Sequence, residues 1–152
     1  MYLRLIIFLV INFTALGIGS IFTGSGVPSE WYQSLNKAPW TPPGWVFGAA
    51  WTTIMICFSI FMAFAWRKTP NQNLFISLFV LQIILNILWS LVFFKFHFTL
   101  AGIVIIIALT ILIGYFLFAY VHQLKLISLL VLPYFLWLII ATSLNMYILF
   151  KN

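Results

Sequence analysis

LAGIVIIIALTILIGYFLFAY, residues 100–120, contains no Asp, Glu, Lys or Arg. A helix rises about 1.5 Å per residue, so a run of this length crosses the roughly 30 Å of hydrocarbon in a bilayer. Four more apolar runs without charged residues lie at 5–22, 46–66, 74–94 and 126–150. Backbone amides find no water inside a bilayer, so each run must form a helix to satisfy its own hydrogen bonds. The sequence therefore predicts an all-α integral membrane bundle of five transmembrane helices.

The composition supports one membrane domain over residues 1–152. Hydrophobic residues make up 65% of the chain and charged residues 5%, whereas soluble domains carry about 25% charged residues. The first run has a second reading, because Arg4 followed by apolar and then small residues resembles a cleaved secretory signal. Its length and the spacing of Ala15 and Gly19, which suits close helix packing, favour a retained helix.

The charged residues are few and scattered. The net charge is +6, but one or two cations per loop form no stripe for nucleic acid, so contact with anionic lipid headgroups is the expected role. The Lys and Arg residues of short loops determine how a chain is oriented in the membrane. Four cations lie on the N-terminal side and three on the other, which weakly favours a cytoplasmic N-terminus. The two sets are Arg4, Arg67, Lys68 and Lys125 on the N-terminal side, and Lys37, Lys95 and Lys151 on the other.

Conventional catalytic and coupling groups are scarce. The one carboxylate, Glu30, lies in a loop, which disfavours ion-coupled transport because intramembrane Asp or Glu residues usually bind the coupled ion. His97 and His122 should lie on opposite membrane faces, and Cys57 stands alone, so no metal site is expected. Hydrolase and nucleotide-binding motifs are missing.

Aromatic residues are abundant instead, at 20% of the chain with seven tryptophans. The long first loop, residues 23–44, carries Ser29, which can cap a short helix that places Trp31 and Tyr32 on one face. Prolines, among them Pro42 and Pro43, stiffen the rest of the loop, and Pro43 is suited to begin the second span. The first loop is therefore predicted to form a rigid aromatic lid with a short helix.

Three spans carry tryptophan beside polar or small residues on one helical face. These faces contain Gly44, Phe47, Gly48, Trp51 and Met55; Gln82, Asn86, Trp89 and Phe93; and Tyr134, Trp137, Ala141 and Asn145. Such polar residues serve equally as hydrogen bonds between helices. Together with the lid they predict a pocket for a large, flat, mainly apolar ligand held by stacking. Pro133, seven residues into the last span, is predicted to kink that helix and widen the pocket.

These motifs resemble the TspO/MBR family, the tryptophan-rich sensory proteins and the mitochondrial translocator protein, once called the peripheral-type benzodiazepine receptor. The resemblance covers most of the chain in family order. The matching passages run from Trp31-Tyr32 through Pro42-Pro43-Gly44-Trp45 to Trp51, then from Gln82 and Asn86 to Phe93 and Phe94, then from Leu132-Pro133-Tyr134 through Trp137 to Asn145.

The resemblance implies a receptor or sensor in a bacterial cell membrane, linked to tetrapyrrole or stress regulation and commonly a homodimer. It implies binding of protoporphyrin IX, related tetrapyrroles and benzodiazepine-type drugs, with no required cofactor. By matching position, Trp51 and Asn86 would donate hydrogen bonds to a ligand carbonyl. The full set of implied ligand-binding residues is Trp31, Tyr32, Pro42, Phe47, Trp51, Asn86, Trp89, Phe93, Trp137 and Ala141.

Two other functions compete with a receptor. The resemblance allows an enzyme that degrades porphyrin in light and oxygen through Trp31 and Trp137, whose indoles would exchange an electron with the excited ring. Facilitated transport of a porphyrin or sterol-like lipophile is the third hypothesis. The loose cholesterol pattern formed by Leu144, Tyr147 and Lys151 supports sterol binding only weakly, since an aromatic belt with a snorkelling lysine gives the same residues.

Overall fold

The computed structural model describes all 152 residues, and the chain is helical almost throughout. Its α-helices, one π-helical segment (η1) and one 3₁₀ segment (η2) follow one another without a strand. They are α1 (Tyr2–Gly26), α2 (Glu30–Ser34), α3 (Gly44–Ala65), α4 (Gln72–Ser90), η1 (Leu91–Lys95), α5 (Thr99–Ala119), α6 (Val121–Leu124), η2 (Lys125–Val131) and α7 (Leu132–Lys151).

Five helical segments are long and apolar enough to cross a membrane, as the sequence predicts. They are α1, α3, α4 with η1, α5, and the segment from α6 to α7. The predicted boundaries are close for the first four, although α1 extends to Gly26 and so shortens the first loop. Packed against α3 and α4, α1 forms one wall of the bundle.

The prediction for Pro133 is wrong. Residues 125–131 form a 3₁₀ segment, and the last α-helix begins only at Leu132, so Pro133 occupies its first turn. A first-turn residue has no intrahelical partner for its N–H, and a proline there costs no hydrogen bond. Pro133 therefore lies at the start of the α-helical part of the fifth span and not in the interior of an α-helix.

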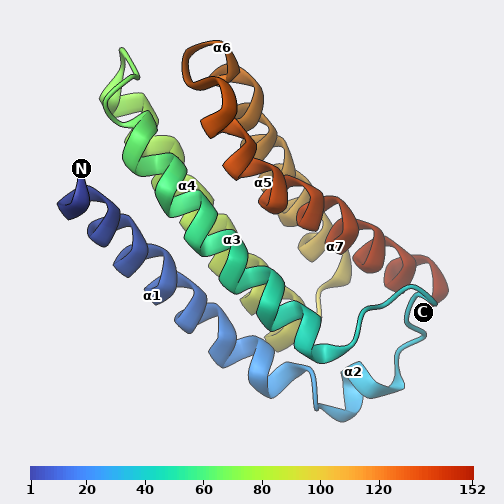
Figure 1. Cartoon of the computed structure of the whole chain (residues 1–152). Helices are drawn as coiled ribbons and strands as arrows, with labels where there is room; N and C mark the ends of the chain where they lie inside the picture. The colour runs from blue at the N-terminus through green and yellow to red at the C-terminus, as the bar shows by residue number, and fades with distance from the viewer.

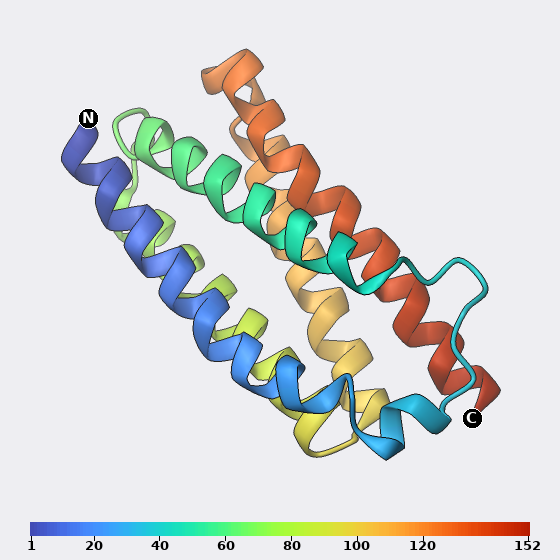
Figure 2. The ribbon, with the colours of Figure 1, turned by 60° about the horizontal axis from the view of Figure 1, so that its bottom comes forward.

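The spans form a closed ring in the order α1, α3, α7, α5, α4, with α4 returning to α1. The N-terminus, the 66–71 loop and α6 lie at one end, and α2 and the C-terminus lie at the other (Figure 1). The connection from α2 to α3 passes the C-terminal end of α7 (Figure 2). His97 and His122 lie at opposite ends of α5, as predicted. We call the end that carries α2 the lid side.

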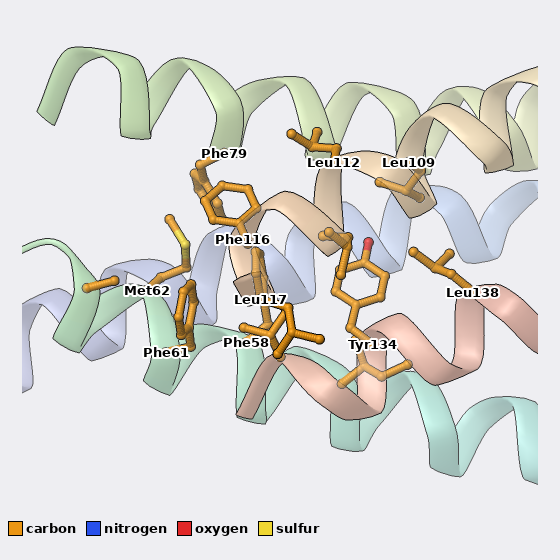
Figure 3. Close-up of a cluster of buried hydrophobic side chains, with 14 of the residues drawn as sticks. Phe58, Phe61, Met62, Phe79, Leu109, Leu112, Phe116, Leu117, Tyr134 and Leu138 are labelled. Atoms are coloured by element: carbon orange, nitrogen blue, oxygen red, sulfur yellow. The ribbon is translucent and has the colours of Figure 1, made fainter. Parts of the chain in front are cut away.

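Aromatic and aliphatic side chains fill the middle of the ring of helices. The side chains of Phe58 and Phe116 pack edge to face with 5.6 Å between the centres of their rings, and the ring centres of Phe58 and Tyr134 are 5.4 Å apart (Figure 3). The lid side of the bundle is built from a different set of residues, which is described below.

The small residues divide between two roles. Ala15 and Gly19 are buried inside the chain, and Gly19 faces Ser90 of α4. Gly44 and Gly48 are exposed with no atom near the position of an added Cβ. The first pair thus packs helices within the bundle, and the second leaves an open face on α3.

Candidate functional site

The lid helix α2 covers the lid side of the bundle with aromatic rings. Ser29 caps it by accepting a hydrogen bond from the Tyr32 amide at 3.2 Å, as the sequence predicts. This short helix turns Trp31 inward, where its indole meets the Phe93 ring edge to face at 5.6 Å. On the other side Trp31 stacks on His97, with 4.0 Å between ring centres and 12° between planes. Nothing in the sequence predicts this last contact, because His97 lies in another loop.

Two aromatic residues below the lid are presented by the π-helical segment η1. The Phe96 amide donates to the Leu91 carbonyl at 3.2 Å, the wider spacing that defines a π-turn. Phe93 then stacks with Trp89 at 5.9 Å, and Phe94 packs against Tyr32 at 5.6 Å. Such π-turns frequently occur at functional sites. Trp31, Tyr32, Trp89, Phe93 and Phe94 are called the lid group.

The second set of predicted residues lies deeper, between α3 and α7. Phe47 meets Trp137 edge to face at 5.3 Å, and Trp51 meets Tyr134 at 5.8 Å. Ala141 is buried one turn beyond Trp137 on the same face. We call Phe47, Trp51, Asn86, Trp137 and Ala141, together with Tyr134, the inner group.

Asn86 is already hydrogen-bonded. Its side-chain N–H donates to the Tyr134 hydroxyl at 2.7 Å, and that hydroxyl donates to the Gln82 carbonyl oxygen at 3.0 Å. All three side chains are buried. The amide nitrogen carries a second N–H, so Asn86 could donate to a ligand either with that N–H or by releasing Tyr134.

Trp89 connects the lid group to the main core. It packs against the cluster of Phe93, Phe94 and Ile148 under the lid and also against the main core. Its indole N–H is buried and has no hydrogen-bond partner. Trp89 therefore links the lid group to the core that also contains Tyr134, Trp137 and Ala141 of the inner group.

The segment after α2 is fastened to the end of α7. The Asn36 amide donates to the Asn152 side-chain oxygen at 2.8 Å, and the Asn36 side chain donates to the Lys151 carbonyl at 3.2 Å. The Trp40 indole donates to the Ser143 hydroxyl at 3.2 Å. Pro42 follows in the same segment and is half-buried. The lid is thus held at α7 as well as at η1.

No charged side chain belongs to the lid group or the inner group, and a lysine lies over one ring of the lid group. Burial raises the pKa of the Tyr32 hydroxyl, which keeps this group a neutral donor. The Lys37 ammonium lies 4.9 Å from the centre of the Tyr32 ring, a cation–π distance. Such surroundings suit a flat, mainly apolar ligand.

Two open grooves also lie on the outer surface of the bundle. One, of about 360 Å³, runs between α3 and α7 and has Trp137 and Pro133 in its wall. The other, of about 300 Å³, lies at the opposite end, between Met1–Leu5 and Ile60–Phe64. Only the first touches the inner group.

The fold and the candidate site together define a class of protein. It is a five-span helical membrane protein whose first loop lies over an aromatic end of the bundle. The chain belongs to the TspO/MBR family, whose pattern matches residues 6–151.

Named relatives agree with this membership. The chain is 38% identical to the tryptophan-rich protein TspO of Archaeoglobus fulgidus, over 88% of this chain and 87% of that protein. It is 29% identical to the tryptophan-rich sensory protein of Cereibacter sphaeroides, over 78% and 74%. It is 28% identical to the human translocator protein, over 84% and 78%.

Proposed function

We propose that this protein is a bacterial cell-membrane receptor that senses tetrapyrroles by binding a porphyrin, protoporphyrin IX, in the aromatic region under the lid. The observation that carries the proposal is that Trp89 joins the lid group to the aromatic core, which also contains residues of the inner group. A flat apolar ring system gains most from such walls, because stacking and edge-to-face contacts add to the burial of apolar area. The name of the Cereibacter relative supports a sensory role.

Binding requires the rings to separate, since they pack on one another in this structure. Trp31 contacts Phe93, and Tyr134 accepts from one N–H of the Asn86 amide. A ligand that enters between them replaces these contacts with its own. Lid movement is thus the conformational change that a sensor of this design would report.

A homodimer remains part of the proposal. The exposed Gly44 and Gly48 leave room on α3 for a close approach of a second helix. The other small-residue pair is occupied inside the chain.

Titration of purified protein with protoporphyrin IX in darkness tests the proposal. Tryptophan emission should be quenched saturably, and Trp51→Ala and Asn86→Ala should each raise Kd about three- to tenfold, the range of one stacking or hydrogen-bonding contact. Trp45→Ala is the matched control, because Trp45 is 74% exposed outside both groups. An unchanged Kd in both site variants would contradict the proposal.

Illumination of the same samples separates binding from turnover. Trp31 belongs to the lid group and Trp137 to the inner group, so an enzyme would need a ligand that reaches both. Faster porphyrin loss than in detergent alone, slowed by Trp137→Phe at unchanged affinity, would support the degrading enzyme. Equal bleaching with and without protein would leave binding as the function.

A further inference from the structure

Trp31, the lid residue that turns inward, is held between two rings. Its indole meets the Phe93 ring edge to face at 5.6 Å. It also stacks flat on the His97 imidazole, with 4.0 Å between ring centres and 12° between planes. Phe93 is buried, whereas His97 is exposed and can exchange protons with water. One of the two contacts that hold Trp31 is therefore made by a group that can gain a charge.

The backbone presents His97 to the lid from a fixed turn. The φ of His97 is 59°, in the left-handed region that His, Asn and Asp adopt more readily than most residues. Hydrogen bonds fix the turn on both sides. The Phe98 amide donates to the Val92 carbonyl at 3.2 Å, and the Thr99 amide donates to the His97 carbonyl at 3.1 Å. The stack of Trp31 on His97 thus joins the lid to a firmly held part of the bundle.

Protonation of His97 strengthens this stack. A neutral imidazole and an indole attract each other as two aromatic rings do. An imidazolium at the same 4.0 Å lies within the roughly 6 Å range of a cation–π interaction, so its charge adds to the attraction of the indole face. Histidine gains its proton as the pH falls from about 8 to 5. The contact between lid and bundle is therefore stronger in acid.

Histidine is the side chain around the stack that changes charge near neutral pH. In unfolded peptides lysine and tyrosine titrate at about pH 10 and glutamate at about pH 4, and burial raises the pKa of Tyr32 further. The ends of α1 and α5 beside the stack carry no charged residue. The other titratable residues at this end are Glu30 and Tyr32 on α2, Lys37 after it, Lys95 on η1, and Tyr147 and Lys151 on α7.

We propose that His97 is a positioning residue of the lid, which holds Trp31 more strongly when protonated and so makes lid opening depend on pH. This inference rests on the proposed function, in which the rings under the lid separate before a porphyrin enters. It adds regulation to that function. Acid keeps the lid closed and slows entry of the ligand, and neutral pH releases the lid.

Hydrogen exchange of the ligand-free protein at about pH 5.5 and about pH 7.5, on either side of the histidine titration, tests the proposal. Each rate is divided by the rate of the unfolded peptide at the same pH, which removes the chemical effect of pH on exchange. Protection of residues 30–36 in the wild type should be about two- to fivefold higher at the lower pH, the range of a cation–π contact. Equal protection at the two pH values would overturn the proposal.

Two variants separate the ring of His97 from its charge. His97→Asn removes the ring and suits the left-handed backbone. It should lower lid protection about two- to tenfold at about pH 7.5, the range of one stacked aromatic pair, and should abolish the pH dependence. His97→Phe keeps an aromatic ring that cannot be charged, so lid protection should no longer change with pH. A pH dependence that persists in His97→Asn would contradict the assignment.

The matched controls are His122→Asn and Glu30→Gln. His122 is also exposed but lies at the opposite end of α5, and Glu30→Gln removes the carboxylate beside Trp31. Both variants should keep the wild-type pH dependence of lid protection. Its loss in either variant would assign the effect to a group other than His97.

The rate at which protoporphyrin IX quenches tryptophan emission, measured in darkness at about pH 7.5, separates the two levels of failure. If the porphyrin does not bind the wild type, the proposed function is wrong and regulation of entry falls with it, while exchange still decides whether His97 holds the lid. If it binds, entry into His97→Asn should be faster by about the factor by which lid protection falls, because the lid gates the site. An equal entry rate in the two proteins would overturn the regulation alone. The wild-type exchange comparison decides even where a variant does not fold.

Discussion

Tyr134 joins two polar side chains, Asn86 and Gln82, inside the bundle. Its hydroxyl accepts from Asn86 and donates to Gln82, so one oxygen satisfies both amides. Tyr134→Phe should lower the free energy of unfolding by about 1–3 kcal/mol, because it leaves a buried donor and acceptor without partners. Thermal unfolding in detergent measures this. Tyr115→Phe, at an exposed position, should leave the midpoint unchanged; an equal loss in both variants would contradict a role for the hydrogen bonds.

Gly26 ends α1 against the Phe94 ring, and this approach admits no side chain. An added Cβ would lie 2.5 Å from the Phe94 Cβ. Gly26→Ala should therefore destabilise the protein by about 1–3 kcal/mol, the cost of overpacking. Gly24→Ala, where no atom lies within 4 Å, should be neutral or stabilising by up to about 1 kcal/mol. A stable Gly26→Ala variant with an unmoved thermal midpoint would show that the contact is loose.

The sequence identified individual residues well where helical spacing determines their neighbours. The face of α4 that carries Gln82, Asn86 and Trp89 was found from spacing alone, and Gln82 and Asn86 prove to be buried. Spacing carries no information on which helix lies opposite. The bond from Asn86 to Tyr134, 48 positions away, and the stacking of Trp31 on His97 therefore emerged only from the packed bundle.

At the scale of elements, the lid is held at two places. Asn36 is bonded to the end of α7, and Trp40 contacts both Ser143 and the Tyr147 ring. Asn152→Ala combined with Trp40→Ala should release the end of the lid that is bonded to α7, while Trp31 stays stacked on His97. Amide hydrogen exchange in residues 30–36 should then accelerate, while exchange in α5 stays constant.

A matched variant isolates this effect. Ser25→Ala removes an exposed hydroxyl that bonds only within its own helix, and it should leave lid exchange unchanged. Lid exchange that is equally slow in the double variant would show that η1 alone holds the lid.

The elements were predicted more reliably than their internal geometry. Five spans and a Ser29-capped lid helix follow from apolar length and capping chemistry. The 3₁₀ segment at 125–131 does not, because its residues are as apolar as those of the helix that follows. The sequence therefore predicts a kink at Pro133 inside a span, whereas Pro133 lies in the first turn of α7.

For the whole molecule, five spans place the two termini on opposite sides of the membrane. Cysteines introduced at Lys68 and Lys125 should react together with a membrane-impermeant maleimide from one side, and cysteines at Lys37 and Lys95 from the other. The background is Cys57→Ala, which removes the one native cysteine. The weak excess of cations on the N-terminal side predicts that Lys68 and Lys125 face the cytoplasm. If the cysteines introduced at Lys37 and Lys68 react from the same side, the five-span topology is contradicted.

Hydrogen exchange with and without protoporphyrin IX tests most directly whether the bundle and its lid enclose the ligand. We predict that the porphyrin slows exchange in α2, in η1 and in the lid-side turns of α7, the elements around the aromatic region under the lid. Slower exchange confined to Met1–Leu5 and Ile60–Phe64, with α2 and η1 unchanged, would place the ligand in the outer groove and contradict a site under the lid.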